Sequence, residues 1–507
     1  MRTLALLVAT VASIGACSEP RPLPAPGLYS AYSVSLQAGF GDEVDVLFVV
    51  DDSSSMAEEQ AALTAGFEDF VRALVDPPDE DGDLVPDRDT AGTLHVGVIS
   101  TNMAASGYPL PGCGKTPPGP DGVLQHVPSR GVVGCDEEYP AFLSFDAATD
   151  DLAALATDFA CIATLGTGGC EWQQPLFALE KALTVHAARG GANDGFLRAD
   201  AMLAILVVTV DDDCSVADPT IFGDDKTLGP IAFRCLNHPD MIRPVSEFVD
   251  ATLSFKPGHP GRLVVSAIVG VPADLVDLSE AQLSSDDVMS RADFDRILAD
   301  PRMIERVDDS PESEGRRLVP SCDVPGLGLA KPPRRIVEWV RGVDEVGNNG
   351  IVQSICQADW ADSVDAIARL IASKLPAGCL ARPLVGPDGM PLETGDHADC
   401  LLREFVPFEE DADGACGRGR IPMGVDEDGA AICQICQRGD GVPPHELDAG
   451  GNGVTMCADS TDFWFYDSND HDCGGAGKVR SAGDAPRFAP GGEVRLQLQC
   501  LRFLEDD

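Results

Sequence analysis

The sequence predicts an α/β fold, with a doubly wound, mostly parallel sheet followed by a small β-rich, cysteine-rich module. Between residues 45 and 375, short apolar segments rich in β-branched residues alternate with segments of helical periodicity. Strands that are apolar on both faces are typical of parallel sheets covered by helices. From residue 376 onward, eight cysteines among many glycines predict a second unit that depends on disulfides.

The expected elements follow in order along the first region. The expected strands are 45–50, 94–100, 202–210, 262–270 and 350–355. Apolar residues at helical spacing predict helices at 56–75, 150–162, 173–188, 244–255, 292–299, 334–341 and 361–375. We therefore expect one domain at 44–375, with insertions closed by disulfides, and a C-terminal module at 376–507.

The N-terminus predicts export. A basic start, an apolar run and Ile14–Cys17 resemble a lipoprotein signal peptide (residues 1–16), in which Cys17 becomes the lipidated first residue of the mature chain. Residues 17–43, with a proline-rich start, would be a tether, and Ser18 favours the outer membrane of a Gram-negative bacterium. The alternative is a signal peptide without lipidation. No later apolar run approaches the length needed to span a bilayer.

Charge limits the partners. The chain has 36 basic and 83 acidic residues, a net charge of −47 and a pI near 4.2. Such a surface repels nucleic acid and anionic lipid, so we expect no nucleic-acid partner and membrane contact only through the lipid anchor.

The cysteine count fits an oxidising compartment, because sixteen of the 17 cysteines remain after Cys17. Sequence proximity suggests five pairs: Cys113–Cys135, Cys161–Cys170, Cys214–Cys235, Cys322–Cys356 and Cys379–Cys400. The last six, Cys416, Cys433, Cys436, Cys457, Cys473 and Cys500, allow 15 connectivities. In this compartment we interpret the Cys433-Gln-Ile-Cys436 motif as part of structural disulfides rather than as a redox pair or a zinc site.

The clearest functional motif is a D-x-S-x-S pattern directly after the first strand. Asp51, Ser53 and Ser55 fall in the turn between this strand and the next helix, where open α/β sheets bind ligands. One carboxylate and two hydroxyls are hard oxygen ligands, which suit Mg²⁺ or Mn²⁺ and also allow Ca²⁺. The alternative is a serine-rich turn before a helix that binds no ligand.

With strand, motif and helix in this order, residues 44–375 resemble the von Willebrand factor type A (VWA) domain family and its metal-ion-dependent adhesion site, in a Rossmann-like sheet. The resemblance implies a further threonine ligand, for which Thr167 is the best match and Thr164 the alternative. It also implies an aspartate after the 202–210 strand. Here the chain departs from the family pattern, because Val210 follows Thr209 and the acidic residue comes one position late. We expect Asp211 to serve, with Asp212 as the alternative.

A second acidic segment has a different pattern. Asp79, Asp81, Asp83 and Asp87 around Gly82 resemble the calcium loops of thrombospondin type 3 repeats. Only one copy is present, whereas such repeats normally come in series, so a solvated acidic loop is the favoured interpretation and a calcium loop is the alternative.

These observations favour a binding protein over an enzyme. The resemblance implies a cation that is one ligand short, so that a carboxylate of an unknown protein partner completes the coordination. The alternatives are a structural envelope lipoprotein whose fold binds no metal, and a metal-assisted hydrolase. The sequence has no H-E-x-x-H, no G-x-S-x-G and no complete phosphate loop, so we expect no enzymatic activity.

Overall fold

The structure is a computed structural model of the chain. It describes residues 29–37, 43–77 and 90–375, together with parts of 378–503 that are mainly strands. Within 90–375 it omits 111–112, 114–119, 130–131, 148, 200, 284–287, 311–316, 325–327 and 358. The expected signal peptide, Cys17 and the acidic segment with Asp79, Asp81, Asp83 and Asp87 lie outside the described residues.

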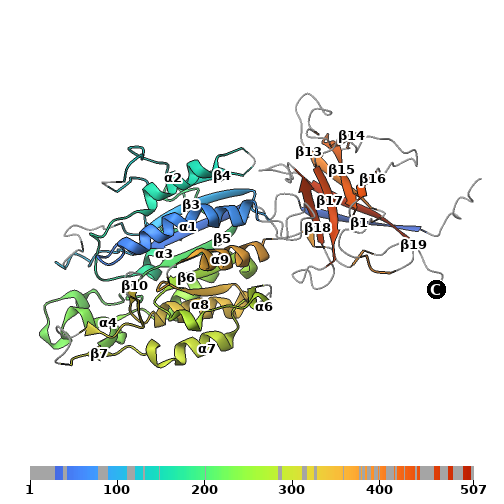
Figure 1. The fold of residues 1–507 in the computed structure, drawn as a ribbon. Helices are drawn as coiled ribbons and strands as arrows, with labels where there is room; N and C mark the ends of the chain where they lie inside the picture. Colours follow the sequence, from blue (N-terminus) through green and yellow to red (C-terminus); the bar gives the residue numbers. More distant parts are fainter. Residues whose placement is uncertain are drawn as a thin grey trace, which may run out of the picture.

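A six-stranded sheet forms the centre of the first region, in the order β11-β6-β5-β2-β3-β4 (Figure 1). Its strands are β2 (Glu43–Val50), β3 (Thr93–Ser100), β4 (Leu143–Asp146), β5 (Met202–Val208), β6 (Leu263–Val269) and β11 (Gly350–Ser354). Neighbouring strands are parallel except β3 and β4, which are antiparallel. The expected mostly parallel sheet is therefore confirmed, and the short antiparallel edge strand β4 was not predicted.

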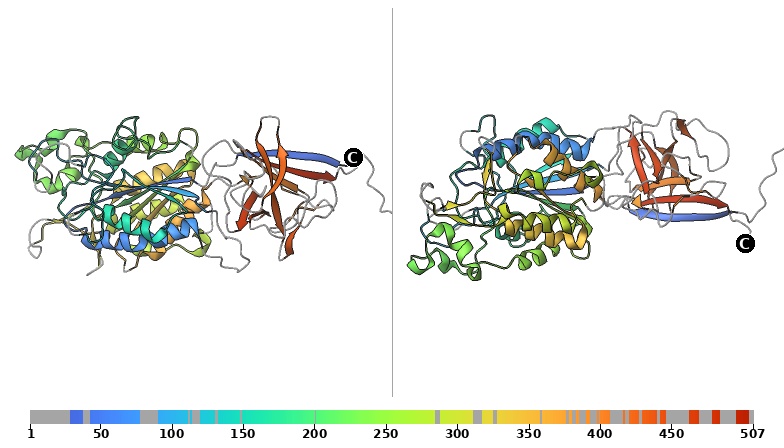
Figure 2. Two further views of the ribbon diagram at one scale, coloured as in Figure 1. Left: turned by 90° about the horizontal axis from the view of Figure 1, so that it is seen from above. Right: turned by 60° about the horizontal axis from the view of Figure 1, so that its bottom comes forward.

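Helices cover both faces of this sheet (Figure 2). One group, whose members contact one another, contains α1 (Ala57–Val75), α2 (Leu152–Ala163) and α9 (Ala361–Ser373). The other contains α3 (Pro175–Leu183), α5 (Val245–Leu253), α7 (Arg291–Ala299) and α8 (Arg334–Gly347). The α4 (Arg234–Asn237) and α6 (Glu280–Leu283) helices are single turns. Because helices shield both faces, the three central strands are almost wholly buried, as their apolar sequences require.

Aromatic side chains fix the first helix group on the sheet. Phe48 of β2 makes edge contacts with Phe67 and Phe70 of α1, and Phe67 stacks on Phe159 of α2 with ring centroids 3.6 Å apart. All four side chains are buried. These packed rings hold the middle of α1 against β2 and α2, which fixes the helix on the sheet.

Disulfides join the insertions above the sheet. The structure pairs Cys113 with Cys170 and Cys135 with Cys161, so the expected Cys113–Cys135 and Cys161–Cys170 bridges are wrong. Both bridges connect the long insertion before α2 to α2 itself or to the loop that follows it. These four cysteines therefore pair with the cysteine nearest in space rather than with the one nearest in sequence. The expected Cys214–Cys235 and Cys322–Cys356 bridges are confirmed.

Two short hairpins lie in the stretch before α8. They are formed by β7 (Val307–Asp308) with β8 (Arg317–Leu318), and by β9 (Cys322–Val324) with β10 (Gly328–Ala330). The sequence predicted no strands here. Strands this short carry too few residues for a periodic signal.

The second region is a nine-stranded sheet with the order β1-β19-β13-β15-β17-β18-β12, and with β14 and β16 paired to β15. Its strands are β1 (Tyr29–Gln37), β12 (Gly378–Cys379), β13 (Cys400–Val406), β14 (Ile421–Val425), β15 (Ala431–Gly439), β16 (Val442–His445), β17 (Asp462–Asp467), β18 (Lys478–Gly483) and β19 (Arg495–Phe503). This confirms the β-rich C-terminal part.

Strand β1 corrects the predicted tether. It pairs with β19 in an antiparallel register from Tyr29 opposite Phe503 to Gln37 opposite Arg495. Residues 29–37 were expected to belong to a linker at 17–43, yet they complete a sheet whose other strands come from the end of the chain. No local pattern reveals a pairing across this sequence distance.

The bridges of the second region also differ from the expectation. Cys400 pairs with Cys500 rather than with Cys379, because their strands β13 and β19 are neighbours with these two residues in register. Cys416 pairs with Cys433, and Cys436 is in a disulfide as well. Cys433 and Cys436 are therefore not bridged to each other, as expected for structural cysteines.

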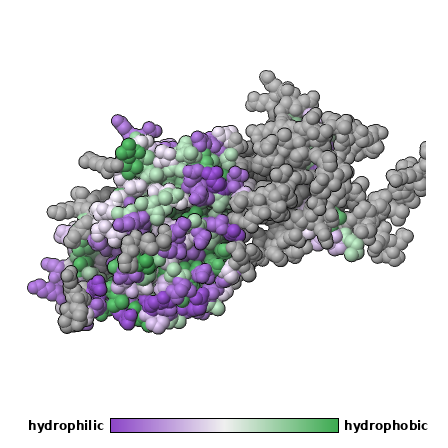
Figure 3. Space-filling model, in the orientation of Figure 1, coloured by the Kyte–Doolittle hydropathy of each residue, from purple (hydrophilic) through white to green (hydrophobic). Residues whose placement is uncertain are grey.

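Within the described residues, no helix is long and apolar enough to cross a bilayer. On the face of the α/β region in Figure 3, hydrophilic and hydrophobic residues are interspersed among the described side chains.

Candidate metal centre at the carboxyl edge of the parallel sheet

The expected D-x-S-x-S motif lies at the point where the strand order of the sheet reverses. Strand β2 is bordered by β3 on one side and by β5 on the other, and all three are parallel. The chain therefore leaves β2 toward one side and returns to form β5 on the other. Ligands of open α/β sheets bind at such switch points, outside the carboxyl ends of the strands. The loops at this point are 51–56 after β2 and 209–215 after β5.

Asp51 is the central residue of the site. Its side chain is fully buried; Oδ1 accepts a hydrogen bond from the Ser53 amide at 2.7 Å, and Oδ2 accepts one from Thr209 Oγ1 at 2.7 Å. Burial and, to a smaller extent, the nearby negative charge of Asp211 raise the pKa of Asp51 to about 7. This carboxylate has no arginine partner among the described residues, so a positive charge placed beside it is favoured.

Ser53 provides a buried hydroxyl without a partner. Its Oγ atom has no hydrogen-bond partner among the described residues, yet the hydroxyl lies close enough to the Asp51 carboxylate to lower its pKa. Buried polar atoms without partners are rare in folded proteins and call for an explanation. Ser55, two residues later, is exposed. The motif thus combines one buried carboxylate, one buried free hydroxyl and one accessible hydroxyl.

The loop after α2 lies against this motif. The Gly169 amide donates to the Asp52 carbonyl at 2.8 Å, and the Gly166 amide donates to Gln60 Oε1 at 3.0 Å. A Cβ atom on Gly169 would lie 1.9 Å from Asp52 Oδ1, so a larger residue there would require the Asp52 side chain to move. Thr167 lies between the two glycines with an exposed side chain, and Thr164 is half-buried at the end of α2. The structure brings the predicted loop to the site but gives Thr167 no contact with Asp51.

Thr209 connects the two halves of the site. Its hydroxyl donates to Asp51, and the same oxygen accepts from the Asp211 amide at 3.0 Å. Asp211, one position later than in the family pattern, is still held beside Asp51 with a mostly buried side chain. It forms an ion pair with Lys331.

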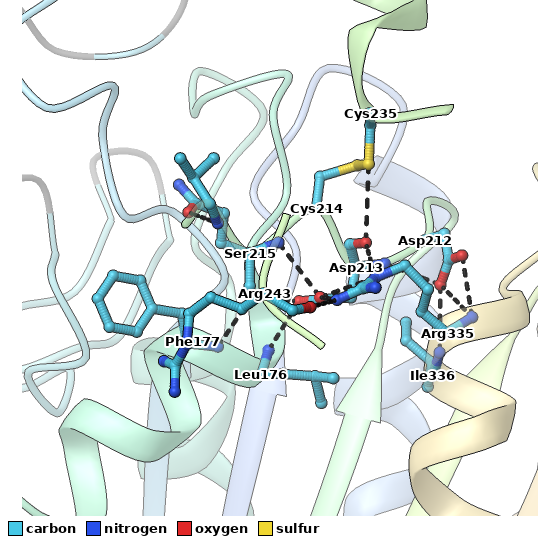
Figure 4. Close-up of polar contacts among 12 residues, drawn as sticks. Leu176, Phe177, Asp212, Asp213, Cys214, Ser215, Cys235, Arg243, Arg335 and Ile336 are labelled. Atoms are coloured by element: carbon cyan, nitrogen blue, oxygen red, sulfur yellow. Dashed lines mark hydrogen bonds and ion pairs between the residues drawn. A yellow bond between two sulfur atoms is a disulfide. The ribbon is translucent and has the colours of Figure 1, made fainter. Parts of the chain in front are cut away.

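The next two aspartates are structural (Figure 4). The Asp212 carboxylate accepts from the backbone amides of Arg335 and Ile336, at 3.0 and 3.2 Å, and so caps the start of α8. Asp213 is paired with the Arg335 guanidinium at 3.0 Å. Burial raises the pKa of Asp212 well above its ordinary value. Asp212 is therefore engaged elsewhere, which disfavours it as the alternative ligand.

Lys331 and Glu171 belong to the site but were not predicted. Glu171 accepts from the Ser54 amide at 3.2 Å. Burial by itself would lower the pKa of Lys331, but the negative charges of Asp211, Asp51 and Glu171 outweigh burial and raise it. Lys331 occurs in a stretch without helical or strand periodicity, and it reaches the site only through the fold. No sequence signal marks it, whereas Glu171 is at least adjacent to the predicted glycine loop.

A cavity of about 280 Å³ opens beside these residues. Asp211, Glu171 and Lys331 line its polar end, and Trp172 contributes to the apolar wall. Glu305 also lines it, with a pKa raised by burial. The cavity gives the site room for a side chain or a small ligand group.

The donor set fits a hard divalent cation. Among the described residues there is no cluster of three or more histidine, cysteine or acidic side chains that could hold a metal. The candidate set is of another kind, since it joins two carboxylates to serine hydroxyls, and the partnerless Ser53 Oγ is the observation that fits a missing ligand interaction. Oxygen ligands of this type suit Mg²⁺ and Mn²⁺.

No protein-family model matches the chain, and no curated protein matches it. Among solved structures, similar chains include the pilus adhesin SpaC from Lactobacillus rhamnosus GG in its open conformation, with 10% identity and a TM-score of 0.27 over 93% of this chain and 47% of SpaC. The pilus adhesin RrgA from Streptococcus pneumoniae gives 10% identity and a TM-score of 0.21 over 94% of this chain and 59% of RrgA. The chain spans about half the length of these proteins. Similarity at these TM-scores carries no argument about fold or function.

Proposed function

We propose that the protein is an exported binding protein with a VWA-type domain, which holds a carboxylate-bearing protein partner through a divalent cation. Asp51, Ser53 and Ser55 would hold the ion, and Asp211 and Thr167 would complete its surroundings directly or through water. When bound, the cation supplies a positive charge and an open coordination position for the partner's carboxylate. We propose no catalytic step.

The observation that carries this proposal is the buried Ser53 hydroxyl. Among the described residues its Oγ atom has no partner within hydrogen-bond geometry, and it lies beside a buried carboxylate whose pKa is raised to about 7. Both features are unfavourable in the protein alone, and a cation bound between the two side chains relieves both. The position at the switch point of the sheet supports the same conclusion.

The proposal places the protein on the cell surface, attached through lipidated Cys17, with the described cavity and disulfide-closed insertions around the metal site selecting the partner. Mg²⁺ or Mn²⁺ is the proposed ion, and Ca²⁺ remains compatible with the oxygen donors. The second candidate function is a structural envelope lipoprotein without a metal. The Lys331–Asp211 ion pair favours this candidate, because it already supplies one positive charge to the site.

Calorimetric titration of Mg²⁺, Mn²⁺ and Ca²⁺ into the soluble form that begins at Ser18 tests the proposal. We expect saturable binding by the wild type and at least about a tenfold loss of affinity in Ser53→Ala, because metal-site substitutions commonly cost this much. Ser254→Ala is the matched control, since Ser254 is exposed at the end of α5 and its hydroxyl donates to the Ala251 carbonyl within the same helix. Equal affinity in the Ser53 and Ser254 variants, or no binding by the wild type, would contradict the proposal.

A further inference from the structure

Lys331 places a positive charge at the proposed metal site. Its Nζ atom is ion-paired with Asp211, and the charges of Asp51 and Glu171 also act on it. A lysine ammonium is fully charged at neutral pH. The same three carboxylates that would attract a divalent cation therefore already face a cation that belongs to the chain.

The backbone of Lys331 is fixed at this position. Its amide donates to the Val210 carbonyl at 2.8 Å, directly after β5, and the neighbouring Ala330 carbonyl accepts from the Ser321 amide at 2.9 Å. A Cβ atom on Gly270 would lie 2.4 Å from the Lys331 carbonyl oxygen, so the absence of a side chain at Gly270 permits this contact. The hairpin of β9 and β10, of which Cys322 is bridged to Cys356, leads into Lys331.

The side chain, in contrast, has freedom to move. It is 41% exposed, and it lines the cavity of about 280 Å³ that also contains Glu305. A lysine side chain is flexible and ends in a compact charge, unlike the planar guanidinium of arginine. A change of rotamer can therefore separate the Lys331 ammonium from Asp211 without a change in the backbone.

We propose that Lys331 is a built-in competitor of the divalent cation: its ammonium neutralises the site when metal is absent and must leave Asp211 when metal binds. This inference rests on the proposed function. It makes Lys331 the residue that sets how tightly the site holds a cation. The site would then be occupied only where the concentration of the divalent cation is high enough to displace the lysine.

The test compares Mn²⁺ binding by the wild type, Lys331→Met and Lys331→Arg, measured by calorimetry on the soluble form. Removing the charge is expected to tighten binding at least about tenfold, since a like charge within a few ångström of the ion is lost. Lys331→Arg keeps the charge and should stay within about threefold of the wild type. Lys181→Met is the matched control, because Lys181 of α3 is ion-paired with Asp121 at 2.6 Å, and its removal should leave Mn²⁺ affinity unchanged.

Thermal unfolding gives an independent readout. In the presence of a chelator, Lys331→Met should melt below the wild type, because three acidic groups lose their neutralising partner. Added Mn²⁺ should raise its melting temperature more than that of the wild type. If wild type and Lys331→Met bind Mn²⁺ equally, or if Lys331→Arg gains as much affinity as Lys331→Met, the competitor role is overturned while the proposed function stands. If no variant binds Mn²⁺, both are overturned.

Discussion

A buried aspartate lies at each end of strand β2, and the two aspartates have very different hydrogen-bond partners. Asp45, near the amino end, accepts from the backbone amide of Arg198 at 2.8 Å and from Arg198 Nε at 2.7 Å. Asp51, directly after the carboxyl end, accepts among the described residues from the Ser53 amide and the Thr209 hydroxyl, and it lies near a second aspartate, Asp211. One end has its own fixed counter-charge, and the other does not.

We interpret this difference as that between a structural carboxylate, Asp45, and the carboxylate of the proposed metal site, Asp51. Arg198 also bonds to Thr93 Oγ1 at 2.7 Å and to the Val44 carbonyl at 3.0 Å, so its guanidinium is locked in place. The cation nearest to the other end is Lys331, whose flexible side chain is partly exposed. A locked arginine excludes an external cation, whereas a mobile lysine allows one to enter.

Removal of the fixed counter-charge should have the largest effect. Arg198→Met leaves Asp45 buried with its main partner gone, and we expect a loss of about 3–5 kcal/mol in the free energy of unfolding. Guanidinium chloride unfolding in the presence of chelator measures it. A loss below about 1 kcal/mol would show that Asp45 does not depend on Arg198, and would remove the contrast between the two ends of β2.

A second prediction concerns pH. Burial raises the pKa of Asp45 to about 6, more than Arg198 lowers it. Because the folded state binds this proton more tightly than the unfolded state, the contribution of Asp45 to stability is complete below about pH 4 and is lost as the pH rises to about 6. Asp45→Asn should remove this decline. The check is the unfolding free energy of both proteins between pH 4 and pH 7; parallel curves would contradict the assignment.

Asp212→Ala should have a smaller effect, confined to stability. It removes the acceptor for the first amides of α8, and leaving buried amides unpaired costs about 1–3 kcal/mol. Mn²⁺ affinity should stay within about twofold of the wild type, because both oxygens of this carboxylate accept hydrogen bonds from the first amides of α8. A large loss of Mn²⁺ binding in a folded Asp212→Ala protein would make Asp212 a ligand and reverse the assignment of the neighbouring aspartates.

The sequence predicted the long elements well, and it placed Asp51 and Ser53 correctly in the chain, directly after β2. The apolar segments 45–50 and 262–270 correspond to β2 and β6, and the helix expected at 56–75 is α1 at Ala57–Val75. These elements are long and buried, so their periodicity is strong. Asp51 and Ser53 follow from position alone, because a residue directly after a central parallel strand must lie at its carboxyl edge.

The remaining features depend on tertiary contacts that leave no local signal. Strand β1 pairs with β19 at the other end of the chain, and Cys113 meets Cys170 because two insertions pack together. Lys331 reaches the site from a hairpin with strands of three residues. The different partners of Asp211, Asp212 and Asp213 likewise depend on tertiary structure, because Arg335 of α8 lies beside Asp213 only in the folded chain.

The smallest change in stability is expected from Asp51→Asn. The substitution keeps a side chain of the same size, removes a buried charge beside Asp211, and should change the unfolding free energy in chelator by no more than about 1 kcal/mol. Mn²⁺ binding should nevertheless be lost. Calorimetry and chemical unfolding of the same preparation test both parts, and a destabilisation as large as that of Arg198→Met would mean that Asp51 is structural.

The most direct test of the central claim is the anomalous scattering of Mn²⁺ in crystals of the protein grown with this ion. The account predicts an anomalous peak at the carboxyl edge of β2, beside Asp51 and Ser53 Oγ, with the Lys331 ammonium withdrawn from Asp211. A map at saturating Mn²⁺ with no peak there, and with Lys331 still paired to Asp211, would contradict it.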